Sequence, residues 1–177
     1  MNSKFLILLL AGLTLATVSS AEAPSERFAQ TALGILPPSQ KLALTPAMKD
    51  ALRPAWGGRY SGRTETYREH AGVRIWVLRA RGKHGWVRAG FAVENGRIIK
   101  TEVLFSKEQR GKVIQTSRFL RQFSGVGLKQ GKKLDRHIDG YSGATISVNA
   151  MKKMALAVLI LDSFIPVEAV TEPPPSI

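Results

Sequence analysis

The chain has 177 residues, with 26 Lys and Arg against 13 Asp and Glu, a formal net charge of +13 at pH 7 and no cysteine. Without thiols it cannot form disulfides, cysteine-bound metal centres or a lipoprotein anchor, so any redox chemistry needs a bound cofactor. The charge favours an anionic partner. The basic residues are scattered and form no nucleic-acid-binding motif, so we predict no nucleic-acid partner.

The first residues have the pattern of a secretory signal peptide. Lys4 precedes an apolar run over residues 5–18, and Ser19-Ser20-Ala21 supplies a small-x-small cleavage site. The run is short for a membrane span. We predict a signal peptide over residues 1–21 and an exported, periplasmic or extracytoplasmic protein that is soluble after cleavage.

Residues 22–69 are predicted to form an N-terminal helical segment without recognisable chemistry. Apolar residues at helical spacing predict a helix over residues 26–36 that the Pro37-Pro38 pair ends. Thr45 before Pro46 predicts a capped short helix that runs to about residue 53.

The next part of the chain has the pattern of strands. Residues 73–80, 86–93 and 98–105 are rich in β-branched and aromatic residues, and Asn95-Gly96 is a hairpin turn between the last two. Successive strands joined by turns predict an α+β fold, an antiparallel sheet built on a hairpin and packed with helices. They argue against a doubly wound nucleotide-binding fold.

Two more helices are predicted after the strands. Residues 113–123 place Phe119, Leu120 and Phe123 on one apolar side. The helix that begins near Thr145 is apolar all round over residues 155–161, which predicts burial on most sides. We assign residues 70–165 to the functional domain and residues 166–177 to a Pro-rich tail.

The segment Asp139-Gly140-Tyr141-Ser142-Gly143-Ala144-Thr145 places a hydroxyl on a small-residue turn where the last helix begins. Small residues let a bulky group approach the backbone, and a helix N-terminus presents N–H groups and a positive dipole end to an anion. The pattern suits a phosphate ester. The alternative is a simple N-cap, in which Ser142 or Thr145 accepts from the N–H groups of the first turn.

This heptapeptide, Asp-x-x-Ser-Gly-Ala-Thr, resembles the acceptor motif of the FMN-binding domain family. The family includes flavin-carrying subunits of the Rnf and sodium-pumping NADH:quinone oxidoreductase complexes. A Phe-x-x-Gln-Phe-x-Gly block at residues 119–125 matches the family at all four specified positions. The Glu- and Gly-containing loop at residues 107–111 is a weaker match, because Gln109 stands where many members have threonine. The resemblance covers roughly residues 73–162.

The resemblance implies that a flavin transferase attaches FMN through its phosphate to Thr145, with FAD as donor and AMP as leaving group. The chain would then relay electrons between membrane or periplasmic redox partners, and it would be an electron-transfer flavoprotein rather than a stand-alone catalyst. Besides Thr145, the cofactor-binding residues predicted on this basis are Ala144, Gly143, Ser142, Asp139, Gly140, Gln122, Phe123, Gly125 and Arg110.

Several of these residues also have a structural explanation that needs no flavin. Phe123, like Phe119, is at a spacing more typical of core than of flavin stacking. Gln122 is either an exposed helix residue or a hydrogen-bond partner of the flavin edge. Gly125 is also the expected C-terminal glycine of a helix, and Asp139 could cap its own turn.

Two other functions remain open. A basic module that binds the envelope or a membrane surface would need no cofactor. A hydrolase built on Ser142 or Thr145 would need a nearby base; His137 is the only histidine close in sequence, and no Gly-x-Ser-x-Gly motif occurs. The three histidines lack metal-ligand spacing, so we predict no metal site.

Overall fold

The computed structural model describes residues 23–108, 110–130 and 132–166, without the side chains of residues 110 and 111. The predicted signal peptide therefore lies outside the described residues, as does all but the first residue of the predicted tail. The elements in chain order are α1 (Pro24–Leu33), β1 (Gln40–Ala43), α2 (Pro46–Ala51), α3 (Arg53–Trp56), β2 (Thr64–His70), β3 (Val73–Arg81), β4 (Trp86–Glu94), β5 (Arg97–Ser106), η1 (Arg110–Gln115), α4 (Ser117–Leu120), η2 (Arg121–Phe123), β6 (Leu128–Lys129), β7 (Lys133–Leu134) and α5 (Thr145–Asp162).

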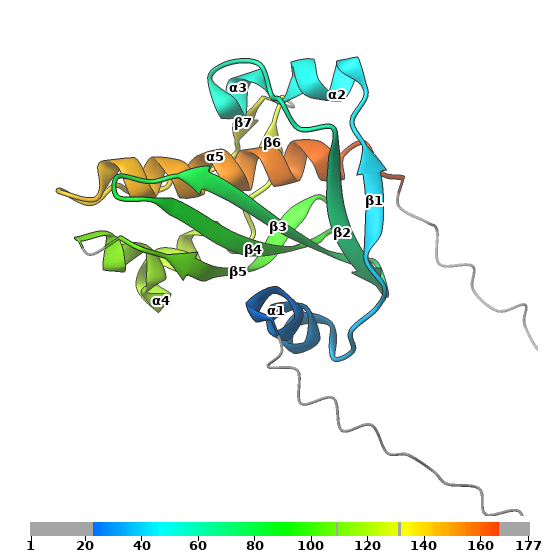
Figure 1. The fold of residues 1–177 in the computed structure, drawn as a ribbon, viewed down its shortest axis with the longest axis horizontal. Coiled ribbons are helices and arrows are strands. Elements are labelled where there is room, and N and C mark those ends of the chain that lie inside the picture. Colours follow the sequence, from blue (N-terminus) through cyan, green and yellow to red (C-terminus); the bar gives the residue numbers. More distant parts are fainter. Residues whose placement is uncertain (1–22, 109, 131, 167–177) are drawn as a thin grey trace, which may run out of the picture.

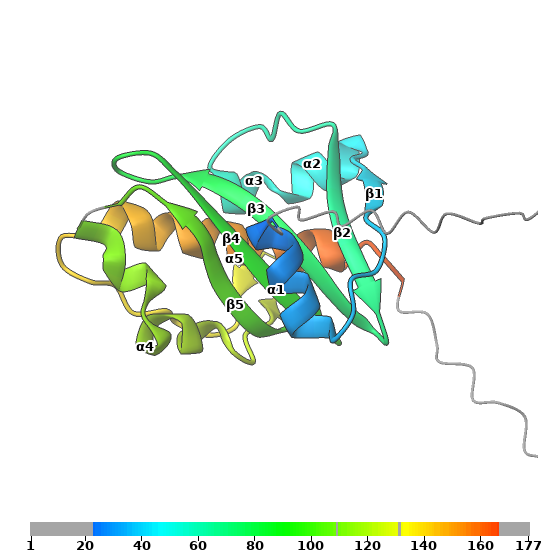
Figure 2. The same cartoon turned by 60° about the horizontal axis from the view of Figure 1, so that its bottom comes forward.

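The centre of the fold is a five-stranded antiparallel sheet in the order β1-β2-β3-β4-β5. Asn95 and Gly96 join β4 to β5 with φ values of 50° and 71°, as the Asn-Gly turn predicts. Helix α5 packs against β3 and β4, and α1 lies on the other face of the sheet (Figures 1 and 2). The predicted α+β class is confirmed.

The two faces of the sheet bury separate apolar clusters. Alternate residues of β3 and β4, such as Trp76 and Phe91, join α5 in the main core, where both side chains are fully buried. On the opposite face Phe28 of α1 packs in a smaller cluster. Its ring lies so close to Gly90 that a Cβ there would come within 2.6 Å of the ring atom Cε1. Glycine in β4 therefore lets α1 approach the sheet.

The N-terminal segment differs from its predicted helical character. Helices α1, α2 and α3 lie in it, and Thr45 caps α2 by accepting from the Met48 N–H. However, the segment also contributes β1 and β2 to the sheet. Helix α1 stops at Leu33, before the prolines, because Gly34 adopts φ 76° and donates its N–H to the Gln30 carbonyl.

The continuous helix predicted over residues 113–123 is wrong. Thr116 is extended (φ −74°, ψ 142°) and its hydroxyl accepts from the Phe119 N–H at 3.4 Å, so it ends η1 and caps the new helix α4. The following turn, η2, is a 3₁₀ helix. Phe119 and Phe123 are nevertheless both fully buried, which confirms the core interpretation of the pair.

Helix α5 has the predicted extent and burial. All five residues of its apolar stripe are buried: Met151, Met154, Ala155, Val158 and Leu161. Within residues 23–108, 110–130 and 132–166, no helix combines the length and apolar character needed to cross a bilayer.

A buried polar cluster holds the end of α5 to the sheet. The Asp162 carboxylate accepts from Trp76 Nε1 at 3.0 Å and lies 3.4 Å from Arg74 Nη1. Arg74 also donates to the carbonyls of Ile165 and Pro166, at 3.3 and 2.6 Å. Its Nε lies 3.3 Å from a carboxylate oxygen of Glu69, although the pair is not aligned for a hydrogen bond. Burial raises the pKa of Asp162, and the Trp76 and Arg74 contacts oppose that rise.

We expect Arg74→Met to lower the free energy of unfolding by about 3 kcal/mol, because it leaves the Asp162 charge buried with fewer partners. Arg53→Met is the matched control. It breaks an ion pair with Asp50 whose side chains are 64% and 67% exposed, and should cost no more than about 0.5 kcal/mol. Urea titrations measure both values. Equal effects of the two substitutions would refute the role assigned to the buried cluster.

Candidate functional site

A tight turn presents Thr145 at the start of α5. The Ala144 N–H donates to the Tyr141 carbonyl at 3.0 Å, and Gly143, the third residue of the turn, has φ 79°, a conformation that favours glycine. Ala144 is 5% exposed and anchors the turn in the core. Ser142, Gly143 and Thr145 are exposed. Thr145 is thus an exposed residue on a rigidly held helix start.

The first turn of α5 has no side-chain cap. Ala144 occupies the N-cap position, and neither Ser142 nor Thr145 accepts from the N–H groups of the turn. The first helical hydrogen bond is donated by Val148 to the Ala144 carbonyl at 2.9 Å. The alternative in which these hydroxyls only cap the helix is therefore wrong. The uncapped N–H groups and the helix dipole favour an anion beside Thr145.

Two of the sequence blocks meet at Asp139. Its backbone N–H donates to Gln122 Oε1 at 2.7 Å, so the glutamine amide holds the chain that leads into the turn. The Asp139 carboxylate is 80% exposed and lies 3.8 Å from His137 Nε2. Among the described residues it makes no hydrogen bond to its own turn, so it is not a turn cap in this structure. Gly140 is exposed beside it.

Phe123 and Gly125 have structural contacts. The Phe123 ring is fully buried and packs edge-on against Phe119 at 5.4 Å between centroids. Gly125 has φ 77°, and its N–H donates to the Ile98 carbonyl of β5 at 2.7 Å. Gly125 follows the 3₁₀ turn η2 rather than an α-helix. Flavin contacts of these residues stay predictions. The Arg110 side chain lies outside the described part of the structure.

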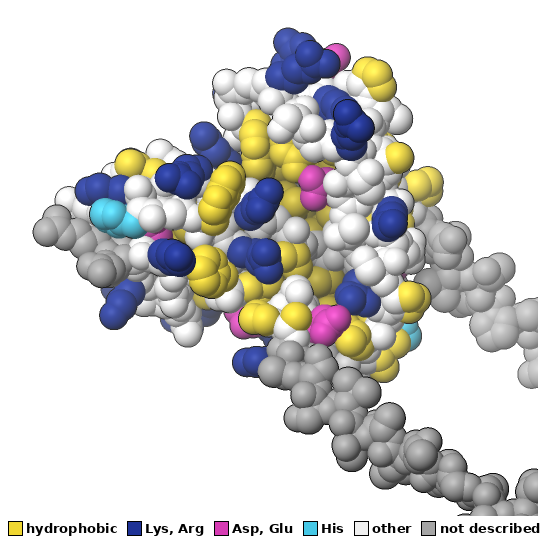
Figure 3. Space-filling view, in the orientation of Figure 1, with side chains coloured by type: hydrophobic (Ala, Val, Ile, Leu, Met, Phe, Trp, Pro, Cys, Tyr) yellow, Lys and Arg dark blue, Asp and Glu magenta, His cyan; other side chains and the backbone are white. Residues whose placement is uncertain are grey.

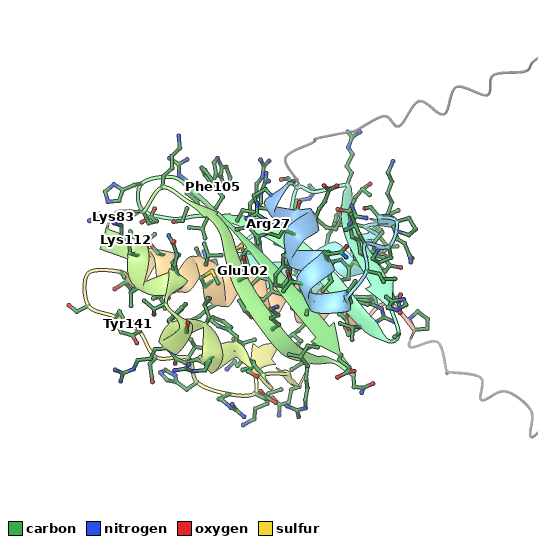
Figure 4. All side chains as sticks on the ribbon, turned by 90° about the horizontal axis from the view of Figure 1, so that it is seen from below. Arg27, Lys83, Glu102, Phe105, Lys112 and Tyr141 are labelled. Atoms are coloured by element: carbon green, nitrogen blue, oxygen red, sulfur yellow. The ribbon has the colours of Figure 1, made fainter. Side chains whose placement is uncertain are left out.

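A buried glutamate connects three segments at the same end of the domain. Glu108 accepts from the His84 N–H at 2.6 Å and from the Ser147 hydroxyl at 2.8 Å. It is 4% exposed, and a Cβ on Gly82 would come 2.6 Å from its Oε1. The network joins the β3–β4 turn and the β5–η1 connection to the first turn of α5. In Figure 4 the labelled Lys83, Lys112 and Tyr141 lie at this end.

The ionised form of Glu108 is favoured in the folded protein. Burial alone would raise its pKa, but the hydrogen bonds from His84, Ser147 and Gly85 hold the pKa below its usual value. Sequence reasoning placed Glu108 in a family block but gave it no role, and it missed Ser147. The signal for Glu108 in the sequence was its position in the connection between the strand predicted over residues 98–105 and the helix predicted over residues 113–123.

A groove lies along the exposed side of α5. It has a volume of about 620 Å³ and extends over α3, the end of β3 and the β6–β7 ribbon. Ile146 and Asn149, in the first turn and a half of α5, line it. A second cavity of the same volume lies on the sheet, where β2 separates from β3, and none of the predicted site residues lines it.

The second cavity contains a coupled pair of titratable groups. The Tyr60 hydroxyl donates to the Glu65 carboxylate. Burial is the main cause of the raised pKa of both groups, and the Arg79 charge lowers each. Across the described residues no three His, Asp or Glu side chains gather as a metal site would require. His137 makes no hydrogen bond to Ser142 or Thr145, so the geometry does not favour the hydrolase.

The candidate site lies within the part of the chain that matches a known family. Residues 82–159 match the model of the FMN-binding domain, a range that includes Gly82, Glu108, the Gln122 block and the Thr145 turn. No curated protein matches the chain. The match therefore identifies a flavin-binding protein. More specifically, the chain contains a domain of the FMN-binding domain family.

Proposed function

We propose that this chain is an exported flavoprotein that carries FMN covalently on Thr145 and relays electrons between partners outside the cytoplasm. The observation that carries the proposal is the exposed Thr145 hydroxyl on an uncapped helix start. The N–H groups of the α5 start would hold the phosphate, and the cations of the groove would offset its charge. Bound FMN would supply one- and two-electron transfer.

Attachment is a phosphoryl transfer in which the chain is the substrate. The Thr145 oxygen would form an ester bond to the FMN phosphorus of FAD, the phosphoanhydride bond would break, and AMP would leave. The hydroxyl proton would pass to a base of the flavin transferase, which also supplies the metal. A covalent link suits an exported protein, because a tethered ligand keeps its local concentration when the surroundings are dilute.

The test is co-expression of the full chain with and without a flavin transferase, followed by intact mass and a visible spectrum under denaturing conditions. We expect a mass increase equal to FMN less one water, and a flavin spectrum that survives denaturation, only with the transferase. The same mass spectrum should show a chain that begins at residue 22. An unchanged mass with the transferase present would refute covalent attachment and leave the cofactor-free basic module as the alternative.

A further inference from the structure

The groove along α5 has an unusual charge. Six cationic side chains line it, and among the described residues no Asp or Glu does. The six are Arg81, Lys132, Lys133, Arg136, Lys152 and Lys153. In the described structure none of them forms a salt bridge. Arg136 donates to the Ser124 carbonyl at 3.3 Å, and its charge acts on the Asp135 carboxylate, whose salt bridge is with Arg97. Figure 3 shows Lys and Arg also spread over the opposite, sheet side, but there they are interspersed with acids.

The floor of the groove is apolar. Ile138 is 2% exposed and Leu134 and Leu156 are half-buried, whereas Ile146 projects with half of its surface exposed. The groove therefore combines a hydrophobic base with a rim of one charge sign. This pattern is complementary to a ligand with an apolar side and an acidic side.

The shape of the groove favours a chain segment over other anionic occupants. Its α5 wall extends from Ile146 to Leu156, about 15 Å at the rise of an α-helix. Residues of α3 and of the β6–β7 ribbon form the other walls of the groove, and both elements lie close to α5 in Figure 1. A flat membrane surface would contact the cationic rim and could not reach the floor between these walls. An amphipathic segment laid in the groove would contact both.

The groove also adjoins the proposed flavin position. Thr145, Asn149, Lys152 and Leu156 follow the i, i+4, i+7, i+11 spacing of one helix face. A segment bound in the groove would thus lie beside the modified threonine. Because α5 is rigidly packed, its position relative to Thr145 would be fixed.

From these observations we propose that the groove binds an acidic, amphipathic segment of a partner protein that exchanges electrons with the flavin. That the partner is a redox protein rests on the proposed function. All residues that line the groove belong to the chain itself, so binding can be measured on the unmodified chain.

The experiment uses the full chain without transferase and a labelled synthetic peptide that forms an amphipathic helix with only Glu and Asp on its polar face. Fluorescence anisotropy at low and high salt measures its affinity. We expect Lys152→Glu/Lys153→Glu to weaken binding by about tenfold or more at low salt. The control Arg27→Glu/Lys41→Glu makes the same change in net charge on exposed residues away from the groove, and should have little effect.

The apolar contribution is tested separately. We expect Ile146→Ser to weaken binding severalfold, whereas Ile99→Ser, at a comparably exposed isoleucine of β5, should not. A scrambled peptide of the same composition should bind more weakly than the amphipathic one. Equal loss in both charge variants, equal binding of the scrambled peptide, or groove-dependent binding of anionic phospholipid vesicles without binding of the peptide would each overturn the proposal. None of these outcomes depends on flavin attachment, so a failure here is distinct from a failure of the proposed function.

Discussion

Thr145→Ala is expected to abolish covalent flavin attachment, whereas Ser142→Ala is expected to retain it. Both residues are exposed, and they lie three positions apart where the turn leads into α5. They differ in position, because Thr145 is the first residue of α5 while Ser142 lies inside the turn, three residues before it. Only a phosphate on Thr145 would sit directly at the uncapped N–H groups. Thr145→Ser keeps the nucleophilic oxygen and should retain attachment, at a lower rate.

Intact mass after co-expression with the transferase measures the attached fraction for each variant. Thermal unfolding of the unmodified chains is the control for folding. The Thr145 side chain makes no hydrogen bond within the described structure, so its substitution should change the free energy of unfolding by no more than about 0.5 kcal/mol. Full attachment in Thr145→Ala, or its loss in Ser142→Ala with Thr145 intact, would show that the acceptor is assigned wrongly.

The sequence predicted those elements whose conformation is determined by residues close together in the chain. The hairpin of β4 and β5 was predictable because asparagine and glycine tolerate positive φ. Helix α5 was predictable from its continuous apolar composition. Strand β2 was not, since Thr64–His70 is largely polar and forms a strand by pairing with β1 and β3. The pairing with β3 is local, through a tight turn in which Ala71 and Gly72 have φ values of 49° and 77°. Alanine is not a typical residue for that conformation, so the turn left little trace in the sequence.

At the candidate site, too, features determined by neighbouring residues were predicted and contacts between distant residues were not. The turn and the start of α5 at Thr145 follow from small residues before an apolar run, and the sequence located both. The hydrogen bond from the Asp139 N–H to Gln122 joins residues 17 positions apart, and the contact of Glu108 with Ser147 spans 39 positions. Side-chain contacts at that separation depend on the packing of the sheet on α5, which residue spacing alone does not reveal.

Glu108→Ala is expected to have the second large effect, on both stability and flavin loading. The substitution leaves the buried Ser147 hydroxyl and the His84 N–H without their shared acceptor. Each lost partner costs about 1–2 kcal/mol, so the free energy of unfolding should fall by about 2–4 kcal/mol. Loading should slow, because the first turn of α5 loses its connection to the β3–β4 turn. Glu102→Ala, on an exposed glutamate of β5, is the control (Figure 4).

A double-mutant cycle with Ser147→Ala separates the contact from other effects of the substitution. Ser147→Ala alone should cost about 1 kcal/mol, and the double variant should be less destabilised than the sum of the two single ones, because the same hydrogen bond is removed in each. Urea titrations of the four proteins give the coupling free energy. Strict additivity would refute the Glu108–Ser147 interaction as a source of stability.

The pH dependence of the Glu108 contribution has a definite sign. Because the pKa of Glu108 is lower in the folded state than its usual value, the unfolded chain takes up the proton first as the pH falls. The stabilisation is therefore complete above the unfolded pKa of about 4.3 and disappears as the pH falls through the folded pKa. Glu108→Gln removes this titration and leaves the other carboxylates, including Asp135, whose pKa is also lowered. The stability difference between the native chain and Glu108→Gln should thus be largest at neutral pH and shrink in acid. A difference that grew on acidification would mean that the Glu108 side chain is protonated in the folded protein and donates, rather than accepts, in this network.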